Sequence, residues 1–517
     1  SQKDLEDKIR KTLRIPSKET FHYEVMRRSL DARKKPSLFY VYCIYVTIRQ
    51  ENSIVKKLHQ PSVSLVTETG YRFSEMGHER LNRRPVIVGA GPCGLFAAWQ
   101  LTLAGYAPLI LERGKQVEDR SADVERFWKT GILQPDSNVQ FGEGGAGTFS
   151  DGKLNTVVKD PSGRNRYVLE TFVKFGAPSD ILYDAKPHIG TDILAKVIKN
   201  MRDYLIKHGA EFRFQTCLKD IQIKENALHA LVTEDDTVIP ADVAILALGH
   251  SARDTFMMLH RHQLPMEAKN FAVGFRVEHP QQMIDDAMYG KRNALRLPAA
   301  PYKVTSNFPN GRGVYSFCMC PGGYVVNASS MKEKTCVNGM SYSGRSGKNA
   351  NSAIIVSVSP ADYGAQDPLD GMHFQETLEH KTYQLGNGKI PQQLFGDYRQ
   401  NIESQGYGDF NSQTKGQTCF ANLRGLMTED MEHSFLLGME HFSNIIPQFD
   451  RSDAILSGME TRTSSPVRIM RDTNGESRVH GIYPGGEGAG YAGGIMSAAM
   501  DGLRLADDVM KRYHPVY

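Results

Sequence analysis

The spacing of apolar residues predicts a strand, a turn, a helix and a second strand in succession from residue 85 onward. Pro85–Val88 is an unbroken apolar run of strand length, and Leu95–Ala104 is a stretch of small and apolar residues that suits a buried helix. Gly105 ends this helix, and Pro108–Glu112 is the second strand, with an acidic residue at its end. Two strands joined by a helix predict an α/β fold with a parallel sheet.

Three later segments extend this pattern. Phe212–Leu218 is predicted as a further strand, and Asp242–Gly249 is an apolar strand that ends in glycine. Gly481–Ile495 contains a strand, a glycine-rich turn and the start of a helix, which continues through Met496–Met510. The order of these pieces predicts a Rossmann-like domain that is discontinuous in the sequence.

The first 80 residues are predicted to form a small α/β module. Leu5–Leu13 has helical spacing, and Leu38–Ile48 is an aromatic and β-branched run typical of a strand. The basic run Arg33–Pro36 precedes this strand as a turn would, and Glu75–Arg84 has the composition of a linker. Residues 261–455 mix strand and turn signals without regular βα alternation. They are predicted to form an inserted α+β substrate domain between the dinucleotide-binding segments 81–260 and 456–517.

Composition narrows the class of protein. The 517 residues are 40% hydrophobic and 23% charged, as in a globular enzyme, and no apolar run is long enough to span a membrane. The seven cysteines show no paired C-x-x-C spacing, so we expect neither a disulfide framework nor a metal site. No signal peptide is visible, and free thiols suit a reducing compartment, so a cytoplasmic location is expected.

Charge is unevenly distributed along the chain. Residues 1–84 hold 18 Lys and Arg against 10 Asp and Glu, a net charge of +8, whereas the whole chain carries +4. An anionic partner of the basic module is one interpretation. We favour the alternative of a solvated basic surface, because the basic residues are not interleaved with a stacking motif, and we expect no nucleic-acid partner.

The first glycine-rich turn, Gly89–Gly94, has the G-x-G-x-x-G spacing of a dinucleotide site. Gly89 would form the tight turn, Gly91 would let the backbone approach a pyrophosphate, and Gly94 would let the helix pack on the strand. The amino terminus of the helix offers free N–H groups to phosphates. Glu112 would accept hydrogen bonds from a ribose diol and would repel a 2′-phosphate. Together these features favour a dinucleotide site over an unrelated glycine-rich turn.

The carboxyl-terminal turn indicates which dinucleotide to expect. A simple NAD dehydrogenase has no use for a second phosphate-cradling turn, whereas a flavoprotein ends the corresponding strand in Gly-Asp and points the next helix at the flavin. Here the pair is Gly486-Glu487. We expect FAD, bound non-covalently because no attachment motif is evident. The predicted cofactor-binding residues are Gly89, Gly91, Pro92, Cys93, Gly94, Glu112, Arg113, Gly145, Gly147, Thr148, Cys217, Leu218, Gly249, Gly486, Glu487, Gly490, Tyr491, Ala492, Gly493, Gly494 and Ile495.

Several strings resemble one family of flavoproteins. They are Arg27–Arg33, Gly142–Leu154, Gly249–Asp254, Phe317–Tyr324, Glu460–Pro466 and Tyr483–Gly494. With them the chain resembles the glutathione-reductase-type flavoprotein superfamily, and within it the bacterial group described as NAD(FAD)-utilising dehydrogenases or FAD-dependent proteins. The resemblance covers nearly the whole chain. It implies FAD and a cytoplasmic redox enzyme, and it implies no particular substrate.

Four residues are candidates for catalysis. His250 follows the flavin-side strand, where an imidazole would donate a proton to substrate or flavin; the alternative is a histidine that caps the next helix. Lys153 would stabilise the anionic reduced flavin ring near its N1–C2 edge. Cys318 and Cys320, two positions apart in a predicted strand, would share one face, either near the flavin or as two buried structural thiols.

Two arginines and one glycine-rich loop are further candidates for contact with a ligand. Arg253 and Arg462 would bind an anionic substrate or the phosphates, or form plain structural ion pairs. Gly142–Gly147 has a G-x-G-G-x-G string, but the residues before it are not a buried strand. We therefore expect a loop that packs against FAD rather than a second nucleotide domain. NADH or NADPH, if used, would bind transiently.

The favoured function is a FAD-dependent oxidoreductase that transfers hydride between flavin and a small-molecule substrate or a nicotinamide donor. One alternative is a FAD-dependent enzyme that modifies tRNA, for which the basic module gives a reason. A second alternative is a non-catalytic flavin-binding sensor or adaptor. Assembly of a homo-oligomer through residues 1–80 is a further alternative.

Overall fold

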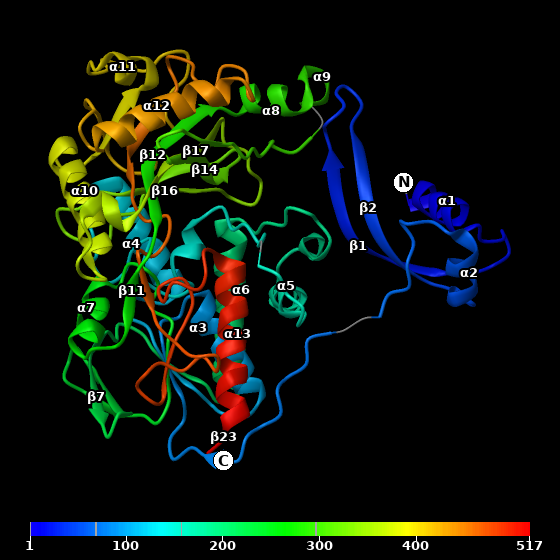
Figure 1. Ribbon diagram of the computed structural model, residues 1–517, viewed down its shortest axis with the longest axis horizontal. Coiled ribbons are helices and arrows are strands. Elements are labelled where there is room, and N and C mark those ends of the chain that lie inside the picture. Colours follow the sequence, from blue (N-terminus) through cyan, green and yellow to red (C-terminus); the bar gives the residue numbers. More distant parts are fainter. Residues whose placement is uncertain (1, 68–69, 157, 295–296, 517) are drawn as a thin grey trace.

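Five short parallel strands form the central sheet of the molecule (Figure 1). The fold is that of a computed structural model, which describes residues 2–67, 70–156, 158–294 and 297–516. The strand order is β22-β10-β4-β5-β6, and each neighbouring pair is parallel. The strands are β4 (Val86–Val88), β5 (Leu109–Leu111), β6 (Glu211–Arg213), β10 (Ala244–Leu246) and β22 (Ile482–Pro484). The predicted Rossmann-like α/β fold is confirmed, with its last strand contributed from the far end of the chain.

The two faces of this sheet are buried in different ways. Alternate residues of a strand point to opposite faces, so Ile87, Ile110 and Ile245 enter a core shared with the covering helices. Val86 and Leu109 enter a second core, together with a three-stranded sheet and a short helix. The helices on the first side are α3 (Pro92–Leu103), α5 (Arg164–Lys174), α6 (Thr191–Lys207) and α13 (Ile495–Arg512). On the second side are β7 (Leu218–Lys224), β8 (Ala227–Thr233), β9 (Val238–Pro240) and α7 (Arg253–Arg261).

One predicted strand is wrong in its extent. Phe212–Leu218 was expected as a single strand, but β6 ends at Arg213 and β7 begins at Leu218. Gln215 between them has φ +52° and donates its backbone N–H to the carbonyl oxygen of Gly114 (2.9 Å). The left-handed backbone at Gln215 breaks the strand and carries the chain into a different sheet.

A seven-stranded sheet forms the inserted domain, in the order β13-β14-β17-β12-β20-β18-β19. Figure 1 shows α10, α11 and α12 on the outer side of this domain. The predicted boundary at residue 456 falls inside β20, so the chain leaves this sheet only after Glu460. The strands are β12 (Phe271–Pro280), β13 (Thr305–Asn307), β14 (Gly313–Cys320), β17 (Asn349–Val358), β18 (Ile390–Leu394), β19 (Thr418–Phe420) and β20 (Ile455–Glu460). The helices are α8 (Gln281–Tyr289), α9 (Lys291–Ala294), α10 (Asp370–Gly386), α11 (Phe395–Gln400) and α12 (Glu429–Ser443).

The amino-terminal module is a β-hairpin with two helices, and it stands to one side of the body (Figure 1). Its hairpin bridges the two larger domains. The backbone N–H of Arg28 donates to the Tyr183 carbonyl oxygen (2.6 Å), and Asn293 of α9 donates to the carbonyl oxygen of Pro36 (2.9 Å). The elements are α1 (Gln2–Leu13), β1 (His22–Asp31), β2 (Phe39–Thr47) and α2 (Glu51–Leu58).

Smaller elements complete the described structure. They are α4 (Val117–Thr130), three 3-10 turns, η1 (Ala146–Phe149), η2 (Ser179–Leu182) and η3 (Pro360–Tyr363), and the short strand pairs β3 (Glu79–Arg80) with β23 (Tyr513–His514), β11 (Met266–Ala268) with β21 (Val467–Ile469), and β15 (Tyr324–Asn327) with β16 (Val337–Met340). Within the described ranges, no helix is both long and apolar enough to cross a membrane.

Candidate functional site

The turn between β4 and α3 leaves a helix amino terminus open. An added Cβ at Gly89, which has φ +103°, would lie 2.3 Å from the Ala247 carbonyl oxygen, and one at Gly94 would lie 1.9 Å from the carbonyl oxygen of Gly89. These two glycines are required by the close packing of strand and helix. Gly91 is different: it is the N-cap of α3 without a side-chain cap, and its Cβ would meet only the Cα of Gly145, at 3.7 Å. The free N–H groups at Gly91 are therefore accessible to a phosphate.

Glu112, at the end of β5, ties this turn to the second glycine-rich loop. The side chain is 6% exposed. Its Oε2 accepts the N–H of Ala90 (2.8 Å), and its Oε1 accepts those of Gly114 (2.9 Å) and Gly142 (3.0 Å). Three backbone donors hold the carboxylate in one orientation at the carboxyl edge of the sheet, which is where the sequence predicts a ribose.

The Gly142–Gly147 loop lies directly on the first turn. The N–H of Gly144 donates to the Ala90 carbonyl oxygen (2.8 Å). Pro92 and Gly147 line a small apolar cavity together with Ile495, at the start of α13. Thr148 Oγ1 is buried and has no hydrogen-bond partner among the described residues. The sequence predicted contacts with one cofactor for these residues, and the fold does bring three separate segments together here.

Arg120 holds this loop in place, and sequence reasoning missed this residue. The side chain is 0% exposed and lies on α4. It donates to the carbonyl oxygens of Asn138 (2.8 Å), Val139 (2.9 Å) and Glu143 (2.7 Å). Burial lowers the pKa of Arg120 to about 10, still well above neutrality, so the guanidinium stays charged. In the sequence, Arg120 is visible only as one arginine within an amphipathic helix.

The carboxyl-terminal turn presents a second open helix end. Gly493 and Gly494, before α13, are exposed, and an added Cβ at either would meet no atom within 4 Å. Further along the helix, an added Cβ at Gly502 would lie 2.1 Å from the Cys93 carbonyl oxygen, so α13 and α3 pack backbone against backbone. Both helices begin at the carboxyl ends of strands of the same parallel sheet.

Several predicted cofactor residues pack against protein instead of facing an open space. Cys93 is buried, and an added Cβ at Gly486 would lie 2.9 Å from its Cβ. Burial raises the pKa of Cys93 well above its usual value, which suits the small filler that the sequence suggested. The Tyr491 ring lies under the guanidinium of Arg471, 3.7 Å from ring centre to Cζ. Gly490 packs on the carbonyl oxygen of Val467 and Ala492 on the core, so the open part of the turn is Gly493 and Gly494.

Three further predicted cofactor residues, Arg113, Cys217 and Leu218, lie in the segments that follow β5 and β6. Arg113 forms an ion pair with Asp254 (2.9 Å) and lies over the ring of Phe141 at 4.4 Å. Cys217 is half-buried near Arg113, and burial raises the pKa of its thiol to about 12. Leu218 is buried, so its side chain packs in the hydrophobic core beneath the sheet and holds this segment in place.

His250 and Glu487, predicted from distant parts of the sequence, meet in space. His250 Nδ1 lies 3.4 Å from Glu487 Oε1, and the histidine side chain is 9% exposed. Gly249 adjoins the same turn, because an added Cβ at Gly488 would lie 2.4 Å from its carbonyl oxygen. The N-cap of α7 is Ala252, without a side-chain cap, so His250 does not cap that helix. Its Nε2 is buried and has no partner among the described residues.

The expectation that Cys318 and Cys320 share one face is wrong. Their strand is interrupted, because the register of β14 against β17 shifts between Phe317 and Cys320, and Cys318 has φ +41°. Such a bulge turns successive side chains away from the regular alternation. Cys318 is exposed, whereas Cys320 is buried with its Sγ 3.1 Å from a guanidinium nitrogen of Arg276.

Lys153 lies close to this bulge. Its Nζ forms an ion pair with Asp151 (3.2 Å) and donates to the carbonyl oxygen of Met319. The segment of Lys153 continues from the Gly142–Gly147 loop through η1, and it contacts the inserted domain at Met319. Lys153 therefore lies where the two larger domains meet.

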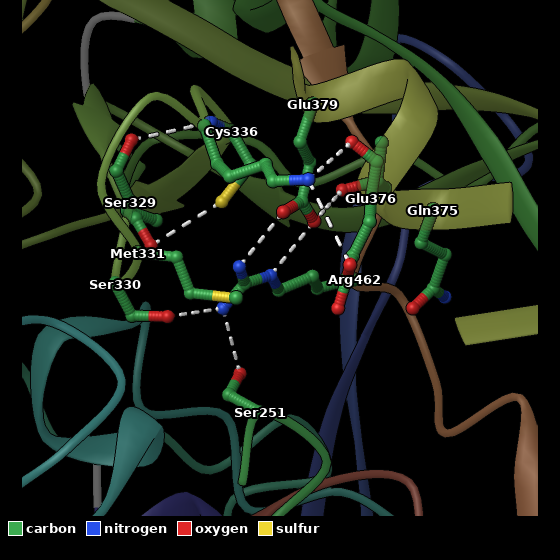
Figure 2. A network of polar contacts seen from close by, with 12 residues as sticks. Ser251, Ser329, Ser330, Met331, Cys336, Gln375, Glu376, Glu379 and Arg462 are labelled. Atoms are coloured by element: carbon green, nitrogen blue, oxygen red, sulfur yellow. Dashed lines mark hydrogen bonds and ion pairs between the residues drawn. The ribbon is translucent and has the colours of Figure 1, made fainter. Parts of the chain in front are cut away.

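Arg253 and Arg462 form a buried network around the carboxylate of Glu379, and Figure 2 shows Arg462 and Glu379 in it. Glu379 of α10 accepts two hydrogen bonds from each arginine, at 2.9 to 3.0 Å, and one from Thr461 (2.7 Å). Figure 2 also shows Arg462 reaching Ser251 (3.0 Å). Of the two alternatives stated for these arginines, the geometry supports structural ion pairs. Within the described ranges, no cluster of three or more His, Cys, Asp or Glu side chains is arranged to hold a metal ion.

Three stretches of the chain match known families. Residues 270–463 match a family described as FAD-dependent protein, C-terminal domain-like, and residues 87–126 match the NAD(P)-binding Rossmann-like domain. Residues 1–47 match a domain of unknown function, DUF8436. The residues of the site fit FAD: two uncapped helix ends, a fixed carboxylate at the sheet edge and two buried polar atoms without partners surround the two glycine-rich turns.

One relative and two solved structures are similar to this chain along most of its length. An uncharacterized protein of Clostridium beijerinckii is 42% identical over 98% of this chain and 96% of its own length. Glycerol-3-phosphate dehydrogenase of Bacillus halodurans, complexed with FAD, has a TM-score of 0.36 at 11% identity, over 84% of this chain and 65% of that one. Glycine oxidase of Bacillus cereus has a TM-score of 0.33 at 12% identity, over 83% and 95%. The chain thus belongs to one family with the Clostridium beijerinckii protein, and its residues 270–463 match the C-terminal domain of FAD-dependent proteins.

Proposed function

We propose that this protein is a dehydrogenase with a dinucleotide domain of the glutathione-reductase type, which transfers hydride between non-covalently bound FAD and a small organic substrate. The observation that carries the proposal is the convergence of two open helix ends, at Gly91 and Gly494, on one edge of the parallel sheet. A dinucleotide needs two such turns when its second half must also be oriented. Bound FAD supplies the two-electron chemistry.

His250 is the proposed proton-handling residue. The 3.4 Å approach of Nδ1 to Glu487 orients the ring and leaves Nε2 for a bound molecule. An imidazole nitrogen can either donate or accept a proton, so Nε2 is the atom that we assign to proton transfer. Because Glu487 belongs to the carboxyl-terminal turn, the same segment that binds the cofactor would also orient the acid–base group.

Lys153 is the proposed cationic residue beside the flavin. Its segment leads out of the Gly142–Gly147 loop, and its ammonium group is held by Asp151 and by the carbonyl oxygen of Met319. A fixed positive charge favours the anionic, reduced form of a nearby ring. Cys318, exposed at the bulge of β14, is the thiol that the same region offers. We assign this exposed thiol contact with a ligand near the flavin.

The test is an anaerobic reduction followed in the visible spectrum. We expect the purified protein to show a flavin band that bleaches when NADH, NADPH or an oxidisable organic acid or amine is added. Bleaching by a nicotinamide identifies the transient donor, and bleaching only by an organic substrate assigns the reductive half-reaction to that substrate. A protein that holds FAD but stays oxidised with every donor contradicts the dehydrogenase and favours a sensor.

A further inference from the structure

Strand β2 (Phe39–Thr47) of the amino-terminal hairpin has one free edge. Its other edge pairs with β1, and the outer edge of β1 is used in turn by the body of the protein. There the Arg28 N–H donates to the Tyr183 carbonyl oxygen (2.6 Å), and the Arg28 carbonyl oxygen accepts the N–H of Ala185 (2.9 Å). Within the described residues, β1 is the one strand that pairs with β2. The backbone groups along the free edge are therefore open to a further strand.

The side chains of β2 suit it to such pairing. No charged residue and no proline stands between Leu38 and Ile48, although lysine and proline are the residues that commonly keep edge strands apart. The side chains of residues 39–42 are 39% to 63% exposed, and three of the four are aromatic. A charged partner strand would lose hydration against these side chains without gaining a counter-charge. The partner that matches β2 in charge is therefore a strand that is itself uncharged.

The sequence of β2 matches itself in the antiparallel direction. Cys43 is the middle residue of the nine in this strand. With a two-fold axis at Cys43, each aromatic residue of one copy lies opposite a β-branched residue of the other, which is a favourable cross-strand combination. The opposed pairs are Phe39 with Thr47, Tyr40 with Val46, Val41 with Tyr45, and Tyr42 with Ile44. An axis moved by one residue, to Tyr42 or to Ile44, leaves a single pair of this kind.

We propose that the protein is a dimer in which β2 of one chain pairs antiparallel with β2 of a second copy around Cys43. The two hairpins then form one continuous sheet in the order β1-β2-β2-β1. Because the two-fold axis makes the same edge serve both chains, the assembly closes and leaves no free edge at its centre. The inference goes beyond the proposed function and does not rest on it, since no residue of the dinucleotide turns takes part.

The test is the molecular mass of the FAD-loaded protein at micromolar concentration, measured by analytical ultracentrifugation. We expect the unmodified protein to be a dimer. Cys43→Lys sets two ammonium groups directly opposite each other, beside the Arg27 that pairs with Cys43 in each hairpin, and should weaken the dimer at least about tenfold. Cys43→Met, a neutral side chain, is the matched control and should remain a dimer. An equimolar mixture of Cys43→Lys and Cys43→Glu should recover the dimer, which misfolded chains would not do.

Oxidative cross-linking tests the register of the two strands. Directly opposite residues have Cα atoms about 4.5 to 5.5 Å apart, a separation that a disulfide can span. The unmodified dimer should therefore cross-link with a mild oxidant, and Cys43→Ser should abolish the cross-link. In the Cys43→Ser background, Tyr45→Cys alone should not cross-link, because Tyr45 lies opposite Val41. Chains with Tyr45→Cys mixed with chains with Val41→Cys should cross-link.

Three results would overturn this dimer. A monomeric protein would leave the free edge of β2 to a strand of a different protein. A dimer that Cys43→Lys leaves intact would have its interface elsewhere. Cross-links formed by Tyr45→Cys alone would contradict the register around Cys43. The FAD content of the Cys43→Lys variant should equal that of the unmodified protein, since Cys43 belongs to the hairpin and not to the dinucleotide domain.

Discussion

Three glycines of one turn differ in what surrounds them, and this difference separates binding from folding. We expect Gly91→Ala to leave the apoprotein folded, because its backbone has φ −77° and the new Cβ would meet only Gly145 Cα at 3.7 Å. The same Cβ would narrow the approach to the N–H groups at the start of α3. FAD affinity should therefore fall about tenfold or more, and Gly91→Val should weaken it further. Fluorescence titration of the apoprotein with FAD measures the change.

Gly94→Ala provides the contrast. Its Cβ would lie 1.9 Å from the Gly89 carbonyl oxygen, so the helix would have to move away from the strand. We expect this variant to lose stability or to misfold, whether or not FAD is present. Full flavin occupancy in Gly91→Val would refute the assignment of this turn as the pyrophosphate site.

At the scale of residues, the sequence predicts backbone roles better than side-chain surroundings. Gly89 and Gly94 could be assigned because the spacing of glycines reflects local geometry. Arg120 could not, because its four carbonyl partners are brought to it by a loop whose path depends on tertiary packing. The face of Cys318 was missed for the same reason: a bulge depends on the partner strand, and nothing in Phe317–Cys320 marks it.

At the scale of elements, Glu379 joins α10 to α7 and to the segment after β20. Burial alone would raise its pKa, but Arg253 and Arg462 outweigh burial and hold the pKa of this carboxyl well below its usual range. We expect Glu379→Gln to reduce the free energy of unfolding by about 3 kcal/mol at pH 7, because two buried guanidinium groups lose their counter-charge. Urea denaturation of the variant and the unmodified protein measures this difference.

The pH dependence of that difference has a definite sign. A carboxyl whose folded pKa lies below its unfolded value of 4.5 stabilises the fold above that pH and loses its contribution as the pH falls further. The gap between the two proteins should therefore shrink below about pH 4.5. Glu376→Gln is the control: Glu376 lies 3.5 Å from Arg253 and is 20% exposed, so its loss should cost less than about 1 kcal/mol. Equal costs for both substitutions would contradict the network's role.

The elements of the dinucleotide domain could be predicted because each short apolar run is followed by its own glycine or acid. Val86–Val88, Leu109–Leu111 and Ala244–Leu246 all fall within predicted strands. For the inserted domain, only the class of fold could be predicted from the sequence. The order of its seven strands depends on pairings between residues more than a hundred positions apart, such as those of β12 with β20. The extent of β6 was missed because Gln215 turns through contacts with Gly114, which lies far away in sequence.

At the scale of the whole molecule, the proposed FAD site joins segments from both ends of the chain. The first turn comes from residues 89–94 and the second from residues 485–494. The hairpin of the amino-terminal module contacts both larger domains, one through its own Arg28 and the other through Asn293 of α9. A ligand that contacts both turns binds only when the discontinuous domain is assembled. FAD should therefore stabilise the whole fold rather than one segment of it.

This linkage makes the melting temperature of the protein depend on the concentration of FAD. A ligand that binds only the folded state adds stability in proportion to the logarithm of its concentration, about 4 kcal/mol at a thousand times its dissociation constant. We expect the melting temperature of the apoprotein to rise steadily with added FAD, and much less with added AMP, which reaches only the first turn and Glu112. Acid denaturation should release the flavin into solution, because the bond is non-covalent. If AMP stabilised the fold as fully as FAD, the carboxyl-terminal turn would have no share in the site, and its open helix end at Gly494 would need another ligand.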